Sequence, residues 1–433
     1  MSPELIGLIA FLILFTLMAA NMPLGICMAL IGFLGYATLG GWNQALTIVA
    51  TSPFDNSAVY YLTVFPLFIL MGEYASSAGL IRGAYHAAHK WLGQLPGGLA
   101  IATIGACGAF AAVCGSSMAT AGAMTSIAYP EMKRYQYDPA LSTGCIVAGG
   151  TLGILIPPST VFIMYAVFAE ESVGKLYMAG LIPGIILASL FMIVIYMLCR
   201  MRPAFGPRGA RAPWKERFVA LKSGIPVIIM AGTVLGGMYM GVFTPNEAAG
   251  VGVVVALVIG LILKRFSGRS IKDGLMQTIT TTTMIFVILI GAMIFNYFIV
   301  LTGIPAILAD FVAGLDLPRI YILIGILLVY VVLGAIMDGF AMTVLTLPIF
   351  IPIIASLGYD LVWFGVIFVM MIEMASITPP IGVNVFVVSS MVREVPMYTV
   401  FKGIMPFLVV MIISLILNVA FPEISLFLPN SMS

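Results

Sequence analysis

Charged residues are scarce in this chain. Only 19 Lys and Arg and 17 Asp and Glu occur among 433 residues, whereas 62% of the residues are hydrophobic. A water-soluble domain carries about a quarter of its residues as charges, so this composition excludes that class and indicates a membrane protein with many helices. The small net charge of +2 comes from short basic clusters between apolar segments and gives no reason to expect a nucleic-acid surface.

Histidine and cysteine are scarce as well. The two histidines, His86 and His89, lie in one basic connector without an acidic cluster nearby, and the five cysteines form no CxxC pair. We therefore expect core cysteines, no disulfide and no transition-metal site. An intramembrane serine hydrolase would need a base near Ser116 or Ser117, where neither His nor Lys occurs, so no enzymatic activity is expected.

Two long apolar segments are interrupted in the same way. Residues 141–168 contain Gly149, Gly150 and Gly153 followed by Pro157-Pro158, and residues 361–391 contain Pro379-Pro380. Proline removes a backbone donor, and in hydrocarbon such a break persists only where protein or a water-filled cavity satisfies the freed carbonyl groups. Paired breaks at corresponding positions of two halves are typical of the binding site of a secondary transporter.

The second half of the chain repeats the first. One constant shift in residue number, called the repeat shift below, aligns Pro23 with Pro245 and Pro130 with Pro352. In each half, two apolar stretches are too short to cross about 30 Å of hydrocarbon, and they meet at a small tip, Gly115–Ser117 or Met337–Gly339. We interpret each pair as a re-entrant hairpin rather than as two full spans. The fold class predicted is an all-α polytopic membrane protein with five spans, one hairpin and one broken helix in each half.

The predicted units follow from this repeat. They are a first repeat at 1–200 (scaffold helices 1–90, hairpin 91–138, broken helix 139–168, closing helix 176–200), a basic linker at 201–222, and a second repeat at 223–433 (scaffold helices 223–302, hairpin 318–358, broken helix 361–391, closing helix 402–422). Five spans is an odd number, so the repeats must be inverted in the membrane. With the N-terminus outside, 17 of the 19 basic residues fall on the inner side, and only Lys175 and Arg319 fall outside. Both termini are therefore predicted to be periplasmic.

The breaks and the hairpin tips carry the candidate site residues. Unwound carbonyls and hydroxyls suit a cation such as Na⁺, whereas helix N-termini suit a carboxylate. The cation candidates are Ser116, Ser117, Gly149, Gly150 and Thr151 in the first half, and Asp338, Gly339, Ser376, Thr378 and Gly382 in the second; the substrate candidates are Pro158, Ser159, Thr160, Pro380 and Asn384. The alternative is structural, since small residues pack helices closely and hydroxyls bond their own backbone.

Asp338 is the only acidic residue at either tip, and the repeat shift aligns it with Ser116. A carboxylate at membrane depth is costly and usually has a partner, which a bound Na⁺ would provide. Alternatively, Asp338 is protonated, or it caps the helix that starts near Phe340. Glu373, just before the second break, is a further candidate for supporting the site, whereas Glu73 is placed to reach solvent.

Five motifs resemble the large membrane subunit of TRAP transporters, the tripartite ATP-independent periplasmic carriers of bacteria and archaea. These are residues 115–120 (GSSMAT), 130–132 (PEM), 149–159 (GGTLGILIPPS), 174–180 (GKLYMAG) and 378–384 (TPPIGVN), and the resemblance covers essentially the whole chain. It implies Na⁺-coupled symport of an organic acid, a C4-dicarboxylate or a sialic or other sugar acid, across the inner membrane by an elevator motion.

The resemblance also implies two partners, a small four-helix membrane subunit and a periplasmic substrate-binding protein. Neither is encoded here, because the chain has no globular domain and no spare group of four helices. An ion-coupled carboxylate carrier of a related elevator family, working without a binding protein, is the alternative. A channel would need a continuous polar pore, whereas the polar groups here cluster at the breaks.

Overall fold

The computed structural model describes residues 2–55, 57–315, 317–380 and 382–432, and every regular element in these ranges is a helix. Six of the described helices are long and apolar enough to cross a membrane, or up to eight spans result if each of two bent helix pairs forms one span. The predicted class, an all-helical polytopic membrane protein, is confirmed. Ile381 of the second break lies outside the described residues.

The first half forms the following helices in order: α1 (Pro3–Ala19), α2 (Leu24–Leu39), α3 (Trp42–Asp55), η1 (Tyr60–Thr63), α4 (Val64–Ser77), α5 (Leu80–Leu92), α6 (Gly98–Cys114), α7 (Ser117–Arg134), α8 (Pro139–Leu155), α9 (Thr160–Ala169), α10 (Val173–Met201) and η2 (Pro203–Phe205). The pair α6 and α7 forms the first hairpin, and α8 and α9 are the two parts of the first broken helix, bent by 42°.

The second half forms α11 (Trp214–Ala231), which continues through the π-helical turn η3 (Gly232–Gly236) into α12 (Gly237–Tyr239), followed by α13 (Pro245–Ile262), α14 (Gly268–Thr302), α15 (Ile304–Ala313), α16 (Arg319–Gly334), α17 (Gly339–Ser356), α18 (Leu361–Ile377), α19 (Val383–Met391), α20 (Met397–Ala420) and α21 (Glu423–Ser431). Here α16 and α17 form the second hairpin, and α18 and α19 are the second broken helix.

Helix boundaries in the two hairpins and breaks coincide under the repeat shift or differ by one or two residues. Helix α17 (339–356) falls on α7 (117–134), and α18 (361–377) falls on α8 (139–155). The caps match as well, because the Asp138 and Asp360 side chains accept hydrogen bonds from the backbone N–H groups of Leu141 (3.0 Å) and Trp363 (2.9 Å). Both Pro-Pro peptide bonds are cis.

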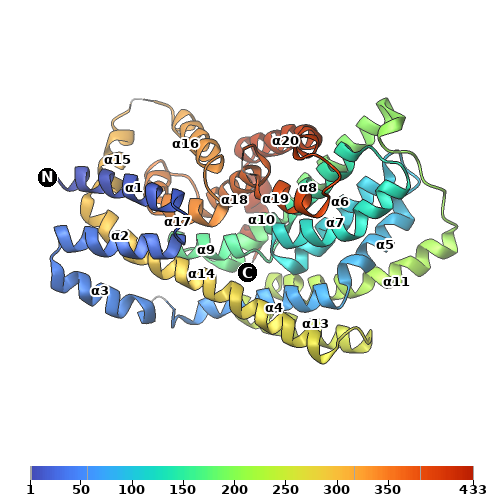
Figure 1. Cartoon of the computed structure of the whole chain (residues 1–433), viewed down its shortest axis with the longest axis horizontal. Coiled ribbons are helices and arrows are strands. Elements are labelled where there is room, and N and C mark those ends of the chain that lie inside the picture. Colours follow the sequence, from blue (N-terminus) through green and yellow to red (C-terminus); the bar gives the residue numbers. More distant parts are fainter. Residues whose placement is uncertain (1, 56, 316, 381, 433) are drawn as a thin grey trace.

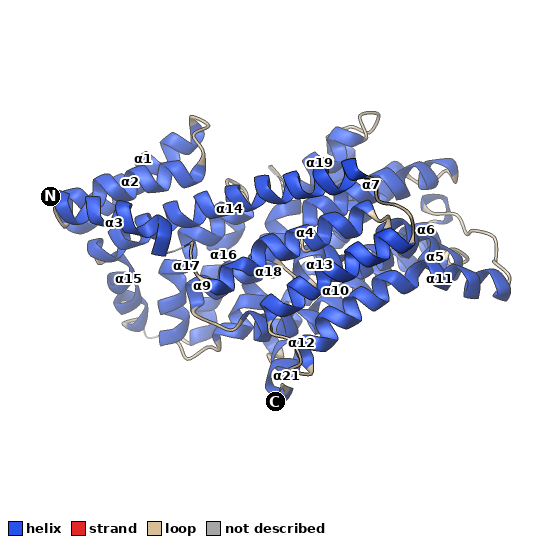
Figure 2. Ribbon diagram, turned by 90° about the horizontal axis from the view of Figure 1, so that it is seen from below, coloured by secondary structure: helices blue, strands red, loops and turns tan. Residues whose placement is uncertain are grey.

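The longest helix, α14, runs along much of the molecule, and α2 packs beside it. In Figure 1 the second hairpin and the second broken helix are drawn above α14. Glycine makes the α2–α14 contact possible, since a Cβ atom at Gly25 would lie only 2.5 Å from the Val287 carbonyl oxygen. Figure 2 shows α14 and α4 crossing the same face of the molecule. Helices α2 and α14 form one wall of the cavity described below.

Residues 42–55, within the region predicted as scaffold helices, form α3, and Trp42 packs edge-on against Phe33 of α2 with ring centroids 5.2 Å apart. Helix α11 begins at Trp214, inside the predicted linker 201–222. Arg217 anchors this part by donating hydrogen bonds to Gln94 Oε1 (2.7 Å) and to the Ala212 carbonyl (3.0 Å).

Other elements are longer than predicted or were missed. Helix α14 begins at Gly268, well before the apolar run that starts at Thr282, because Ser267 caps its N-terminus in a capping box with Ser270. The closing helix α10 begins at Val173, where the Ser172 hydroxyl accepts from the Lys175 N–H group. The short helices α15 and α21 have no counterpart in the prediction.

Candidate functional site

A cavity of about 320 Å³ lies where the two hairpin tips approach the second break. The first tip contributes Ser117 and Met118, and the second contributes Met337 to Phe340. The remaining lining residues come from the hairpins, the breaks, α2 and α14: Leu24, Ile154, Val161, Met284, Ile288, Gly334, Ile372, Glu373, Ala375, Ser376, Val383 and Asn384. The fold thus brings both tips to one volume, as the sequence analysis expects of a binding site.

The first tip packs tightly on the first broken helix. A Cβ atom at Gly153 would lie 2.6 Å from the Ser116 carbonyl oxygen, and one at Gly115 would lie 2.8 Å from the Pro158 carbonyl oxygen. Gly115 also has a positive φ of 67°, which glycine adopts without strain. The glycines of this motif therefore allow backbone to approach backbone, and they place the Ser116–Ser117 tip directly against α8.

Hydroxyl groups in this first cluster bond to nearby backbone. Thr151 Oγ1 donates to the Ala148 carbonyl at 2.6 Å, Ser116 Oγ accepts from the Ala119 N–H at 3.3 Å, and Ser159 Oγ accepts from the Phe162 N–H at 3.3 Å. Thr160 Oγ1 donates to the Gly115 carbonyl at 3.5 Å and so links the break to the tip. These side chains stabilise the local backbone, as the structural alternative predicts for hydroxyl residues.

The second cluster is different, because it contains a buried carboxyl group. Glu373 is 0% exposed, and its Oε2 atom lies 3.3 Å from the Ser376 hydroxyl. Asn384, which is also 0% exposed, donates through Nδ2 to Ser376 Oγ at 3.2 Å. Two oxygens remain without a hydrogen-bond partner, Glu373 Oε1 and Asn384 Oδ1. Buried, unpaired oxygens of this kind are costly unless a cation, a proton or water occupies the space beside them.

Asp338 lines the same cavity from the second tip. Its Oδ1 atom accepts from the N–H groups of Phe340 (2.8 Å) and Ala341 (3.1 Å), so the capping role considered in the sequence analysis is present in the structure. Asp338 and Glu373 give this cavity two carboxyl groups, and the described lining contains no Lys, Arg or His. The cap uses only the Oδ1 atom of Asp338. Two carboxyl groups without a basic side chain in the described lining make this cavity a candidate cation site.

The other predicted second-half cation candidates take various positions. Thr378 Oγ1 donates to the Met374 carbonyl at 2.6 Å, four residues earlier in the chain. Gly382 has φ of +52° and lies within the break, and Gly339 starts α17 beside Ile372. Of the predicted substrate residues, Asn384 lines the cavity, Pro158 and Ser159 are buried beside the first tip, and Pro380 is exposed.

Sequence reasoning did not identify the wall formed by Leu24 of α2 and by Met284 and Ile288 of α14. Helices that are apolar on every side give no periodic signal for the face that lines a cavity. It also treated Glu373 only as a supporting candidate. The repeat shift gave a signal for Glu373, because it aligns this residue with Thr151. In the first half, Thr151 lies on the turn that faces the first tip.

A polytopic helical membrane protein in which two hairpin tips and a broken helix enclose a small, mostly apolar cavity with a few polar side chains has the architecture expected of a carrier. The family comparison agrees: residues 11–424 match the family described as "Tripartite ATP-independent periplasmic transporter, DctM component". The chain belongs to this family, and the resemblance to TRAP large subunits is confirmed.

Several relatives carry substrate names. The chain is 36% identical to the C4-dicarboxylate TRAP transporter large permease protein DctM of Pseudomonas aeruginosa, over 90% of this chain and 93% of that protein. It is 28% identical to the sialic acid TRAP transporter large permease protein SiaM of Vibrio cholerae, over 96% of each chain. It is 32% identical to the isethionate TRAP transporter permease protein DctMQ of Oleidesulfovibrio alaskensis, over 96% of this chain and 66% of that protein.

The fold also resembles a solved structure, that of the YdaH transporter of Alcanivorax borkumensis. The TM-score is 0.61 at 15% sequence identity, covering 90% of this chain and 88% of that one. At this identity the likeness concerns the fold alone.

Proposed function

We propose that this TRAP large permease subunit takes up an organic acid together with Na⁺, and that the cavity between the hairpin tips is its binding site. The observation that carries the proposal is the pair of carboxyl groups, Glu373 and Asp338, in one cavity whose described lining has no basic side chain. A cation bound beside Glu373 Oε1 and Asn384 Oδ1 would satisfy both unpaired oxygens. A second Na⁺ site is proposed between the Ser116-Ser117 tip and the carbonyl groups of Gly149, Gly150 and Thr151.

This arrangement gives a physical reason for coupling. An organic acid that enters the cavity alone meets negative charge, and repulsion between charges is strong where water is excluded. Bound Na⁺ reverses the sign of this interaction, so each ligand favours binding of the other. The acid group would then lie between the tips, near the N–H groups of the helix starts after Pro158 and Pro380, which favour negative charge.

The substrate class rests on the relatives. Their names cover a C4-dicarboxylate, a sialic acid and isethionate, which are all organic acids. We place the C4-dicarboxylates first, because the relative with the higher identity, 36%, carries that name. Sialic acid or another sugar acid is the second candidate.

The remaining parts of the proposal follow from the repeat and the family. Matching helix boundaries support two repeats, and the distribution of Lys and Arg supports an inverted orientation with both termini periplasmic in an inner membrane. The hairpins and broken helices would move as one elevator body against the scaffold. The family description names a tripartite, periplasmic system, so we propose a small membrane subunit and a periplasmic substrate-binding protein as partners.

The test is transport by the reconstituted complex. Proteoliposomes containing this chain and its small membrane partner, supplied with the binding protein, should accumulate radiolabelled succinate or sialic acid under an inward Na⁺ gradient. Replacing Na⁺ by choline should abolish accumulation, and a proton gradient should not replace the Na⁺ gradient. Accumulation of either acid that does not change without Na⁺ would contradict Na⁺ coupling, and accumulation without the binding protein would favour the carrier alternative.

A further inference from the structure

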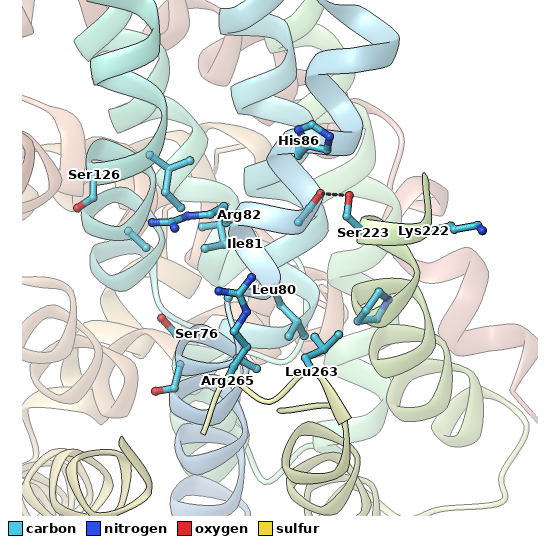
Figure 3. A pocket seen from close by; sticks show the side chains of 17 residues that line it. Ser76, Leu80, Ile81, Arg82, His86, Ser126, Lys222, Ser223, Leu263 and Arg265 are labelled. Atoms are coloured by element: carbon cyan, nitrogen blue, oxygen red, sulfur yellow. Dashed lines mark hydrogen bonds between the residues drawn. The ribbon is translucent and has the colours of Figure 1, made fainter. Parts of the chain in front are cut away.

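A second and larger cavity, of about 680 Å³, opens where α4 ends and α5 begins. Its wall combines α5 with α7 of the first hairpin, the α11 segment around Lys222, and the connection between α13 and α14. Four basic residues line it, Arg82, His86, Lys222 and Arg265, and the described lining contains no Asp or Glu (Figure 3). The first cavity is thus lined by carboxyl groups without basic side chains, and this second cavity by basic side chains without carboxyl groups.

The two arginines of this cavity are not used in the protein's own ion pairs. Nearby basic residues do form such pairs: Lys90 contacts Glu216 at 2.8 Å, and Lys133 contacts Glu394 at 2.7 Å. Within the described ranges, the side chains of Arg82 and Arg265 form neither an ion pair nor a hydrogen bond. Figure 3 shows both guanidinium groups extending to the same side of α5, with Ser76 close to them and Lys222 turned away.

Local structure brings hydroxyl groups to the same place. Gly79 has a positive φ of 74° and separates α4 from α5. The Ser76-Ser77 end of α4 and Arg82 in the first turn of α5 therefore line the same cavity. Ser126 of α7 also lines the cavity, but its hydroxyl donates to the Gly122 carbonyl at 3.3 Å. Unpaired guanidinium groups beside the Ser76 and Ser77 hydroxyls are the chemistry that recognises phosphate or another oxyanion, because guanidinium donates in a planar fork that matches two oxygens.

We propose that Arg82 and Arg265, with Ser76 and Ser77, form a binding site for a phosphate group at the predicted cytoplasmic side of the chain. Basic pockets between helices on this side can bind anionic lipid headgroups, and a free phosphate offers the same oxygens. The volume is within the range of small-molecule sites. This site is separate from the transport cavity and goes beyond the proposed function.

The site would have a mechanical consequence. Its walls come from α7, which belongs to the first hairpin, and from α5 and the α13–α14 connection, which belong to the scaffold. A phosphate group held by Arg82 and Arg265 would therefore bridge the two parts. Binding would stabilise the arrangement described here relative to any arrangement in which α7 has moved away.

Thermal unfolding of the full chain in nanodiscs tests this inference without any transport substrate. One arm titrates inorganic phosphate against chloride at constant ionic strength, in discs of neutral phosphatidylcholine. The other arm compares discs with and without phosphatidylglycerol in the absence of free phosphate. The test variant is Arg82→Gln with Arg265→Gln, and the matched control is Arg208→Gln with Lys215→Gln, which removes equal charge from exposed positions outside this cavity.

We expect stabilisation in at least one arm for the wild type and the control. The test variant should need at least ten times more phosphate, or show no response to phosphatidylglycerol. A response to free phosphate alone identifies a soluble ligand, and a response to phosphatidylglycerol alone identifies a lipid headgroup. No response in either arm, or equal responses in wild type and test variant, would overturn the proposed site. Because no substrate is involved, this result is independent of whether the chain transports an organic acid with Na⁺.

Discussion

The two helix breaks have the same backbone plan and different chemistry. At positions that the repeat shift makes equivalent, the first half has Thr151, Ser116 and Phe162, and the second half has Glu373, Asp338 and Asn384. In the first break the hydroxyls bond to nearby backbone, whereas in the second two buried oxygens lack partners. A repeat can thus keep its helix boundaries while its two copies differ in chemistry. The first copy bonds its hydroxyls to its own backbone and offers only carbonyl groups to the proposed second Na⁺ site, whereas the second carries buried side-chain oxygens without partners.

The largest expected effect is at Glu373. Glu373→Gln keeps the size of the side chain but removes the charge, so it should lower Na⁺ affinity at least tenfold. At a Na⁺ concentration ten times its Kd, wild-type binding stabilises the fold by about 1.4 kcal/mol, and the variant should lose most of this. Thermal unfolding in NaCl and in choline chloride measures the difference.

Thr151→Val, at the equivalent position, is the control and should keep the Na⁺ response. Equal loss of the Na⁺ response in both variants would show that the breaks do not differ in this way.

Asp338 should show the next largest effect. Asp338→Asn keeps the helix cap, since asparagine also accepts from backbone N–H groups, but it removes the charge. We expect a Na⁺ requirement for half-maximal uptake that rises about tenfold, which is about 1.4 kcal/mol, with unchanged protein yield and fold. Uptake against Na⁺ concentration in proteoliposomes measures it.

The matched control for Asp338 is Asp360→Asn, because Asp360 caps α18 and does not line the cavity within the described residues. This variant should transport as the wild type does. Wild-type Na⁺ dependence in Asp338→Asn as well would leave Asp338 with the capping role alone.

The packing of the tips gives a third, smaller contrast. At Gly153 an added Cβ would lie 2.6 Å from the Ser116 carbonyl oxygen, which is backbone, whereas at Gly339 it would lie 2.6 Å from the Ile372 side chain. Backbone cannot move aside as a side chain can, so Gly153→Ala should destabilise the fold by about 1–3 kcal/mol and Gly339→Ala by less. The thermal unfolding midpoints of the two variants provide the measurement. A larger loss for Gly339→Ala would mean that the second tip, not the first, is the tightly packed one.

The sequence predicted the parts of this comparison that depend on local chemistry. Pro157-Pro158 and Pro379-Pro380 located both breaks, and the helix cap at Asp338 is one of the roles that the sequence left open for this residue. It named Glu373 as a supporting candidate but did not predict that Met284 of α14 forms a wall of the cavity, because this depends on tertiary packing of helices that are apolar all round.

The smallest expected effect is at Glu394, which links the first hairpin to the segment that follows the second broken helix. It accepts a hydrogen bond from Tyr129 (2.9 Å) and pairs with Lys133, both on α7, and it follows α19. Lys133 and Tyr129 hold the pKa of this carboxyl below its usual value near 4.5. A depressed pKa means that the pair stabilises the fold at neutral pH and that this contribution is lost as pH falls through the lowered value.

Glu394→Gln should therefore be only slightly less stable than wild type at neutral pH, because exposed ion pairs contribute little to the free energy of unfolding. The difference should shrink as the pH falls below the ordinary carboxyl range, and high salt should reduce it. Unfolding midpoints from neutral to acidic pH provide the measurement. A difference that stays constant over this range would show that the ion pair does not cause it.

The most direct test of the central claim is a pair of high-resolution electron cryomicroscopy maps of the full complex, one in NaCl and one in choline chloride. The difference between the breaks predicts Na⁺-dependent density beside Glu373 Oε1 and Asn384 Oδ1, in the cavity lined by Asp338. Density that is equal in both maps, or no density at this place in NaCl at a resolution that shows ordered waters elsewhere, would contradict the account.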